Sequence, residues 1–119
     1  MERDFRKQAG AEAEARALDY LVAKGLKLIL RNYLCRGGEI DLVMLDGETL
    51  ALIEVRSRSY EAFGGAAGSV DFRKQRSIVF AARHLLMTQP QLAKRRARFD
   101  VVAIARNDKL EWLKDAFRL

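Results

Sequence analysis

Apolar residues recur at helical spacing in two segments of the chain, residues 4–24 and residues 70–89. Gly25 provides a natural stop for the first segment, and Pro90 follows the end of the second. The apolar positions that share a face are Ala11, Leu18, Leu21 and Val22 in the first segment, and Ile78, Ala81, Ala82, Leu85 and Leu86 in the second. These spacings predict two amphipathic helices, each with one buried face.

Shorter runs of apolar or alternating residues predict strands, with turn residues between them. The predicted strands cover residues 26–35, 40–45, 50–58 and 98–105, followed by a final edge strand at 110–113. The strong turn signal Asp46-Gly47 makes the second and third strands a β-hairpin. Residues 60–69 contain three glycines and predict a loop. The order α-β-β-β-α-β-β predicts an α/β fold in which a mixed sheet is flanked by helices.

Composition narrows the class of protein. A chain of 119 residues, 50% of them hydrophobic, fits one globular domain over residues 1–119. No apolar run approaches the ~20 residues that a membrane span needs, and the charged N-terminal segment lacks the apolar stretch of a secretory signal. We therefore expect a cytoplasmic protein that has no membrane partner.

The balance of charge and the scarcity of cysteine and histidine further restrict the class of protein. Twenty-two Lys and Arg against sixteen Asp and Glu give a net charge of +6, which favours a polyanionic partner, although many basic proteins bind no nucleic acid. Cys35 is the only cysteine and His84 the only histidine, which excludes an intrachain disulfide and a four-ligand Cys/His zinc site within one chain. A Cys35–His84 nucleophilic pair is the weaker reading, because lone cysteines are mostly packed.

Three acidic residues occupy positions where the periodicity calls for apolar ones. Glu14 lies four residues before Leu18 and seven before Leu21, on the apolar stripe of the first helix. Asp41 and Glu54 lie on the two strands of the hairpin. Because burying an unpaired charge is costly, these positions are where chemistry is expected.

The register of the hairpin decides how close Asp41 and Glu54 lie. A four-residue turn over residues 46–49 places Asp41 opposite Glu54, whereas a two-residue turn places Asp41 opposite Leu52 and diagonal to Glu54. Arg56 shares their face in both registers. Two carboxylates this close repel unless a proton or a cation bridges them, and Mg²⁺ is the usual bridging ion.

The ordinary alternative is a set of partly buried ion pairs. Glu54 would then pair with Arg56 or Arg58, and Asp41 with Arg36. For each acid alone this is the commoner arrangement, whereas three acids that converge beside a basic residue favour a metal site.

Residues 38–43, Gly-Glu-Ile-Asp-Leu-Val, and residues 53–56, Ile-Glu-Val-Arg, resemble the PD-(D/E)XK nuclease pattern, in which an Asp precedes Glu-x-Lys on the next strand. The chain more specifically resembles the YraN family of small bacterial proteins. The blocks that carry this resemblance are Gly10 with Glu14, Asn32, Gly-Gly-Glu-Ile-Asp-Leu-Val, Glu-Val-Arg-Ser-Arg, Phe63-Gly64-Gly65, Lys74-Gln75, Arg98-Phe99-Asp100-Val101-Val102 and Asp115-Ala116-Phe117.

The resemblance implies a restriction-endonuclease-like fold, close to that of Holliday-junction resolvases, and a metal-dependent nuclease acting on DNA, including branched or processed DNA. It implies that Asp41 and Glu54 hold Mg²⁺ or Mn²⁺, with the Val55 carbonyl as a further ligand. Glu14 resembles the helix acid of the resolvases, and Gln75 resembles a helix glutamine of related nucleases. For Gln75, a solvent-facing side chain is an equal alternative.

Arg56 is the main departure from the nuclease pattern, which has lysine at this position. Arginine stays protonated, so Arg56 is expected to position the phosphate or stabilise developing negative charge. The same departure favours an alternative function, a non-catalytic nucleic-acid-binding module that keeps the fold. A third reading is an interaction protein whose basic face binds a protein partner.

Two basic clusters are expected to grip nucleic acid through its phosphates. The first is Arg73 and Lys74 with Arg76 and Arg83 on the second helix, and the second is Lys94, Arg95 and Arg96 with Arg98 before the following strand. A solvated charged face is a serious alternative for the first cluster. The edge strand at residues 110–113 is expected to permit a homodimer.

Overall fold

The computed structural model describes residues 2–57, 70–105 and 107–118. The helices are α1 (Glu2–Ala23), α3 (Phe72–Thr88) and α4 (Pro90–Ala93), and the strands are β1 (Lys27–Cys35), β2 (Gly38–Asp46), β3 (Thr49–Ser57), β4 (Ala97–Ile104) and β5 (Leu110–Phe117). Helix α3 ends just before Pro90, as predicted. Helix α4 was not predicted, because four residues are too few to show a period, and the predicted loop at 60–69 lies outside the described residues.

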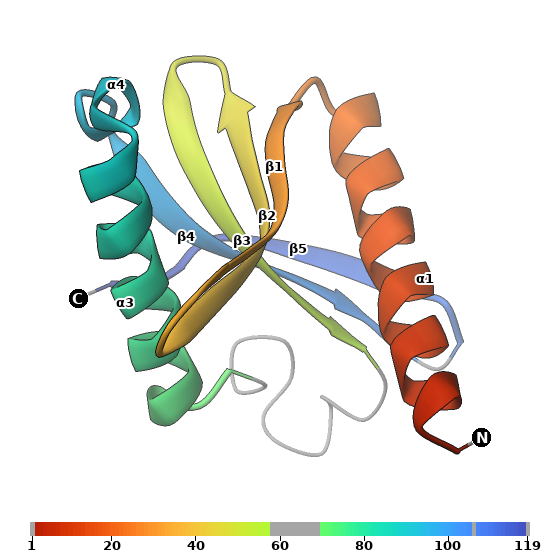
Figure 1. Ribbon diagram of the computed structural model, residues 1–119. Coiled ribbons are helices and arrows are strands. Elements are labelled where there is room, and N and C mark those ends of the chain that lie inside the picture. Colours follow the sequence, from red (N-terminus) through yellow and green to blue (C-terminus); the bar gives the residue numbers. More distant parts are fainter. Residues whose placement is uncertain (1, 58–69, 106, 119) are drawn as a thin grey trace.

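The five strands form one mixed sheet in the order β1-β2-β3-β4-β5. Neighbouring strands are antiparallel except β3 and β4, which are parallel and are separated in the chain by α3 and α4. Figure 1 shows α1 on one side of the sheet and α3 with α4 on the other. The prediction of a mixed sheet flanked by helices is therefore confirmed.

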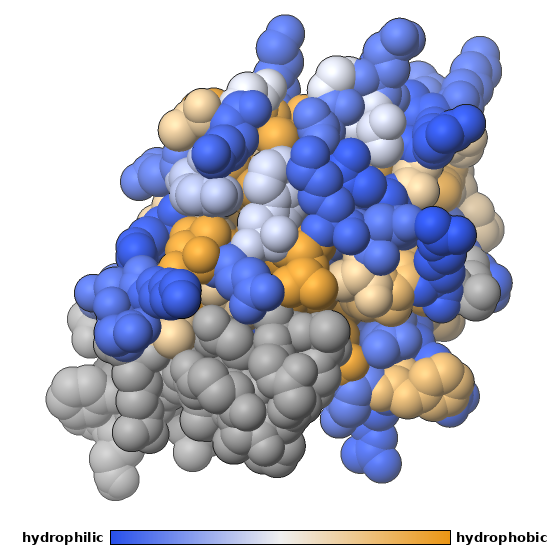
Figure 2. All heavy atoms as spheres, turned by 180° about the vertical axis from the view of Figure 1, so that it is seen from behind, coloured by the Kyte–Doolittle hydropathy of each residue, from blue (hydrophilic) through white to orange (hydrophobic). Residues whose placement is uncertain are grey.

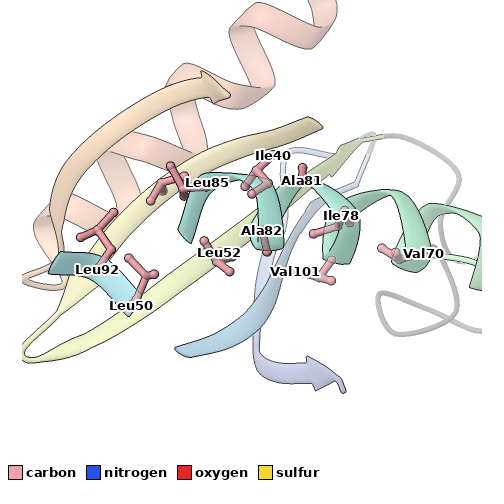
Figure 3. Packing of buried hydrophobic residues seen from close by; sticks show 11 residues of the cluster. Ile40, Leu50, Leu52, Val70, Ile78, Ala81, Ala82, Leu85, Leu92 and Val101 are labelled. Carbon is pink, nitrogen blue, oxygen red and sulfur yellow. The ribbon is translucent and has the colours of Figure 1, made fainter. Parts of the chain in front are cut away.

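Each helical layer covers its own apolar cluster. The cluster under α3 and α4 includes Ile40, Leu50, Leu52, Ile78, Ala81, Ala82, Leu85, Leu92 and Val101 (Figure 3). The cluster under α1 includes Ala17, Leu21, Leu42, Met44, Ala51, Ile53 and Val102. The buried stripe of α1 runs through Glu14, Ala17 and Leu21, whereas Ala11 is exposed and Val22 is 51% exposed. The prediction that Ala11 and Val22 lie on this face is wrong, because the helix turns the side that carries Glu14, Ala17 and Leu21 toward the sheet.

Strands β2 and β3 pair near their shared turn and then separate. Leu45 lies opposite Leu50, which confirms the register of the four-residue turn, and the last pair of this ladder is Leu42 with Ile53. Beyond that pair, β2 continues beside β1 and β3 continues beside β4. The two strands therefore diverge, as Figure 1 shows at their lower ends. We call this opening the β2–β3 fork.

Asp41 and Glu54 lie where the fork begins, each one residue beyond the last ladder pair. Ile40 packs in the cluster under α3, whereas Leu42, two residues further on, packs in the cluster under α1. Residues two apart on a regular strand share a face, so β2 changes its facing at Asp41. Because β2 changes its facing here, the Asp41 carboxylate can interact with side chains on both sides of the sheet.

Gly38, the first residue of β2, allows α3 to lie directly on the strand. A Cβ atom at this position would come 2.3 Å from the backbone oxygen of Ser77 and 3.1 Å from the Cβ of Ala81. We expect Gly38→Ala to lower the free energy of unfolding by about 2 kcal/mol or more, since the helix must shift to relieve the overlap. Urea denaturation followed by circular dichroism measures this change.

The matched control for Gly38 is Gly10, which lies in α1 with nothing within 4 Å of an added Cβ. There alanine should raise stability by roughly 0.5–1 kcal/mol through helix propensity. Equal stability of Gly38→Ala and the wild type would contradict the close approach of α3 to β2.

One buried carboxylate, Asp100 of β4, fastens β5 to the sheet. Asp100 is 0% exposed and accepts hydrogen bonds from Arg98 Nε (2.9 Å), Trp112 Nε1 (3.1 Å) and the Asp115 backbone N–H (2.9 Å). Arg98 also donates to Asp46 at the hairpin turn, at 2.7 Å. Two carboxylates thus engage the Arg98 guanidinium, and the contact of Arg98 with nucleic acid stays a prediction.

The surface is largely hydrophilic on the face shown in Figure 2, with apolar side chains scattered among charged ones. Strand β5 is an edge strand, as predicted, and its exposed side chains include Glu111, Lys114 and Asp115. Charges along an edge disfavour pairing with another strand, so dimerisation through β5 stays a prediction. Within the described ranges, no helix has the length and apolar character needed to cross a membrane.

Candidate active site at the β2–β3 fork

Glu54 is the most unusual side chain of the fork. It is only 2% exposed, and its Oε1 atom is buried with no hydrogen-bond partner among the described residues. Its Oε2 atom lies 3.5 Å from Arg56 Nη1 and 3.6 Å from Lys74 Nζ. A buried carboxylate oxygen without a partner costs free energy in the fold, so this position suits a group that receives a cation.

Asp41 is held by the backbone of the opposite strand. Its Oδ2 atom accepts a hydrogen bond from the Val55 N–H at 2.8 Å. Because β2 and β3 no longer pair here, the carboxylate satisfies a backbone donor that the ladder leaves free. Within the described part of the chain, Asp41 forms no ion pair with Arg36, so the ordinary alternative fails for this acid.

The two acids act on one another electrostatically. Burial, and then the negative charge of Asp41, raise the pKa of Glu54 to about 8, while the charges of Lys74 and Arg56 oppose the rise. The two cations therefore do not fully compensate the buried carboxylate. The Glu54–Arg56 pair of the ordinary alternative exists, but Glu54 remains short of positive charge.

Glu14 reaches toward the same region from α1. It is 9% exposed, and its Oε1 atom lies 3.5 Å from Arg31 Nη2. Burial, and then the charge of Asp41, raise the pKa of Glu14, whereas hydrogen bonding by Asn32 and the charge of Arg31 lower it. The charge of Asp41 thus raises the pKa of both Glu14 and Glu54.

The arrangement fits a hard divalent cation held by two carboxylates. Among the described residues, no three Asp, Glu, His or Cys side chains lie close enough together to hold one ion. Glu14 thus does not form one close cluster with Asp41 and Glu54 in this part of the chain. Mg²⁺ and Mn²⁺ need only one or two carboxylates, with waters and substrate oxygens completing the shell. The unsatisfied Oε1 atom of Glu54 fits such an ion, and the Val55 carbonyl stays a predicted ligand.

Lys74 belongs to the fork, although the sequence placed it in a basic surface cluster. Its Nζ atom lies 3.6 Å from Glu54 and 3.9 Å from Glu39, one acid on each strand of the fork. Asp71 caps α3 by accepting a hydrogen bond from the Lys74 backbone N–H, which fixes the start of the helix. Lys74 lies four residues before buried Ile78, a spacing that could have placed it on the inward face.

The neighbours of Lys74 on α3 do not contact the acids. Arg73 is exposed, and the Gln75 side chain donates to the Val70 carbonyl at 3.0 Å. The Gln75 side chain is thus bonded to the backbone near the start of α3, and its role at the acids stays a prediction.

The second basic cluster lies at the other end of the sheet. Lys94, Arg95 and Arg96 are exposed, and the Arg96 carbonyl accepts a hydrogen bond from the Leu50 N–H. Leu50 and Glu54 are four residues apart on β3, which corresponds to roughly 13 Å along a strand. The structure does not bring this cluster to the acids, so a contact with nucleic acid there would be remote from the fork.

The weaker reading of a nucleophilic Cys35–His84 pair finds no support. The structure places His84 against Tyr33, whose hydroxyl hydrogen-bonds His84 Nδ1. The imidazole is thereby engaged with a phenol, which is not the partner that a cysteine nucleophile needs.

The fold and the fork together define a mixed α/β protein in which half-buried Asp41 and buried Glu54 lie where strands β2 and β3 separate. The chain belongs to the uncharacterised protein family UPF0102, whose model matches residues 13–104. It is 50% identical to a UPF0102 protein of Pseudomonas syringae pv. syringae (strain B728a) over 98% of both chains. It is 47% identical to a UPF0102 protein of Pseudomonas fluorescens (strain Pf0-1) over 92% of both chains. These matches confirm the resemblance of the chain to the YraN-type proteins of this family.

Proposed function

We propose that this protein is a metal-dependent nuclease with the restriction-endonuclease-like fold, which hydrolyses phosphodiester bonds of DNA, including branched or processed DNA. The observation that carries the proposal is buried Glu54, which lies beside Asp41 and two cations and whose Oε1 atom has no hydrogen-bond partner among the residues that the structure describes. The Asp and Glu-x-basic spacing on a hairpin and the net charge of +6 support it.

Phosphodiester hydrolysis requires a positioned water and stabilisation of charge on the phosphate. Mg²⁺ or Mn²⁺ would supply Lewis acidity and a more acidic water at the site. Asp41 and Glu54 would hold the ion, with the Val55 carbonyl as a further ligand. The Val55 N–H keeps Asp41 in place through its 2.8 Å hydrogen bond. Glu14, which lies on the α1 side of Asp41, would orient water by accepting its hydrogen bonds.

Lys74 and Arg56 provide the positive charge that the reaction needs. Both lie within 3.6 Å of the Glu54 carboxylate, from α3 and from β3 respectively. Arg56 can hold phosphate oxygens but remains protonated. In the nuclease pattern the lysine lies on the strand, at the position of Arg56. Here Lys74 supplies an ammonium group from α3, so the site still contains a lysine.

Cleavage of a labelled panel of single-stranded, duplex, flapped and four-way-junction DNA, and of RNA, with Mg²⁺ or Mn²⁺ tests the proposal. We expect wild-type cleavage to fall about 100-fold or more in Glu54→Gln, since the variant loses an anionic ligand. Lys74→Ala should also lose activity. Glu48→Gln, an exposed acid at the hairpin turn, is the matched control and should cleave like the wild type.

The alternative is a nucleic-acid-binding module without efficient chemistry, which Arg56 favours. Gain of cleavage in Arg56→Lys alone, with an inactive wild type, would select a nuclease fold attenuated at this position. Binding without cleavage by any variant would overturn the proposed enzyme and leave the module.

A further inference from the structure

A pocket of about 300 Å³ lies on the outward face of α3, on the other side of the helix from Lys74 and the fork. Its wall is completed by Arg118, which follows the last residue of β5. Figure 1 shows the C-terminal end of the chain beside α3, in agreement with this lining. We call this site the α3 pocket.

Two phenylalanines of the α3 pocket are exposed. Phe72 is 71% exposed and Phe80 is 50% exposed, eight residues apart on one face of α3. Arg76 lies between them, with its guanidinium carbon 5.7 Å from the centre of the Phe72 ring. The Phe80 ring lies beside Gly37, close enough that a Cβ there would be 3.4 Å from the ring. The rings are thus presented to solvent at positions set by the helix and by the β1–β2 turn.

The rim of the α3 pocket is positively charged. Arg76, Arg83 and Arg118 all line it. Arg118 pairs with Asp115, whereas Arg76 and Arg83 have no acidic partner within the described ranges. An apolar aromatic floor under uncompensated guanidinium groups is complementary to a ligand that combines flat rings with negative charge.

We propose that the α3 pocket binds unpaired nucleotides of DNA, with bases stacked on Phe72 and Phe80 and phosphates held by Arg76 and Arg83. Every base offers a flat face, so stacking of this kind tolerates any sequence but requires that the base be free of its duplex. A duplex keeps its bases stacked within the helix and cannot reach the rings. The pocket therefore selects a DNA that carries a single-stranded segment, such as a flap.

The identity of the ligand rests on the proposed function, but its binding does not depend on chemistry at the fork. The test is accordingly made without divalent ions, with chelator present. Fluorescence anisotropy measures the affinity of the full chain for a labelled thymidine oligonucleotide and for a labelled blunt-ended duplex. Metal-dependent cleavage is not part of the readout, so an inactive nuclease leaves the result interpretable.

Phe72→Ala and Phe80→Ala should each weaken oligonucleotide binding by roughly 5- to 100-fold, the range of base–aromatic stacking. Duplex affinity should stay unchanged in both variants. Phe80→Tyr, which keeps a ring, should bind the oligonucleotide as the wild type does. Met87→Ala is the matched control, because Met87 is 79% exposed on the same helix and does not line the pocket.

Wild-type affinity of both alanine variants for the oligonucleotide would overturn the proposal, as would a wild type that binds only the duplex. Sedimentation of the wild type and of Phe80→Ala tests whether a second copy of the chain occupies the pocket instead. A wild-type dimer that dissociates in the variant, without loss of oligonucleotide affinity per protomer, would assign the pocket to self-association instead.

Discussion

Glu54→Gln should make the metal-free protein more stable above pH 8, although changes at a residue only 2% exposed usually destabilise. The folded protein raises the pKa of Glu54 from 4.5 to about 8, so the fold prefers the protonated acid. At about 1.4 kcal/mol per pKa unit, the ionised acid costs at most roughly 5 kcal/mol. Glutamine has the same shape without the charge and removes this cost.

The sign of the pH dependence follows from the raised pKa. Stability linked to Glu54 is fully present below the unfolded pKa of 4.5 and is lost as pH rises through about 8. The wild type should therefore lose stability across this window, and the glutamine variant should not. Thermal melts of both proteins over the window measure the difference, which should grow with pH and reach several degrees.

Two comparisons make this prediction specific to the fork. Glu39→Gln removes another acid that faces Lys74, but the Glu39 side chain is 48% exposed, so its stability should change little with pH. Mg²⁺ should stabilise the wild type above pH 8 and leave Glu54→Gln unaffected. A wild type whose stability is flat across the window would show that the buried carboxylate is compensated in the fold.

Asp100→Ala should lower the free energy of unfolding by about 3–5 kcal/mol, because it removes one partner of a buried ionic network. The Trp112 indole N–H, the Asp115 backbone N–H and part of the Arg98 guanidinium would lose their common acceptor. Asp100→Asn should destabilise less, since one oxygen acceptor remains. Urea denaturation of the metal-free protein measures both changes.

Asp108→Ala is the control for Asp100. Asp108 also pairs with an arginine, Arg16, at 3.2 Å, but its side chain is 84% exposed. Its loss should cost no more than about 1 kcal/mol, the range of surface ion pairs. Equal effects of the two substitutions would refute the role of Asp100 as the anchor of β5.

The sequence predicts the parts of this fold that depend on local periodicity. The order of the long elements follows from spacing and turn residues. The turn signal after Asp46 left two registers of the hairpin open, and both placed Asp41 and Glu54 on one face. Glu14 could be placed on the inward face of its helix because its spacing from Leu21 is set by helical geometry. These are properties of one segment or of two segments joined by a short turn.

The remaining features depend on pairing between distant segments. The fork forms because β2 stays with β1 while β3 follows β4, and no local pattern records that choice. Arg98 looked like a surface charge because its acceptors, Asp46 and Asp100, come from two different strands. Strand β5 extends past the predicted 110–113 to Phe117, since the charges at its exposed edge interrupt the apolar pattern.

The parallel pairing of β3 with β4 has a consequence for the order of folding. Strands β1, β2 and β3 are joined by short turns and can form early, whereas β4 must be brought back across the long connection that contains α3 and α4. Glu54 lies beside Val101 of β4, and Lys74 comes from the same late connection. The early meander would thus leave Glu54 in water, without the burial that raises its pKa in the completed fold. The pairing of β4 with β3 would bury Glu54 and bring Lys74 to it in the same step. The chemistry of the fork would therefore exist only in the completed fold.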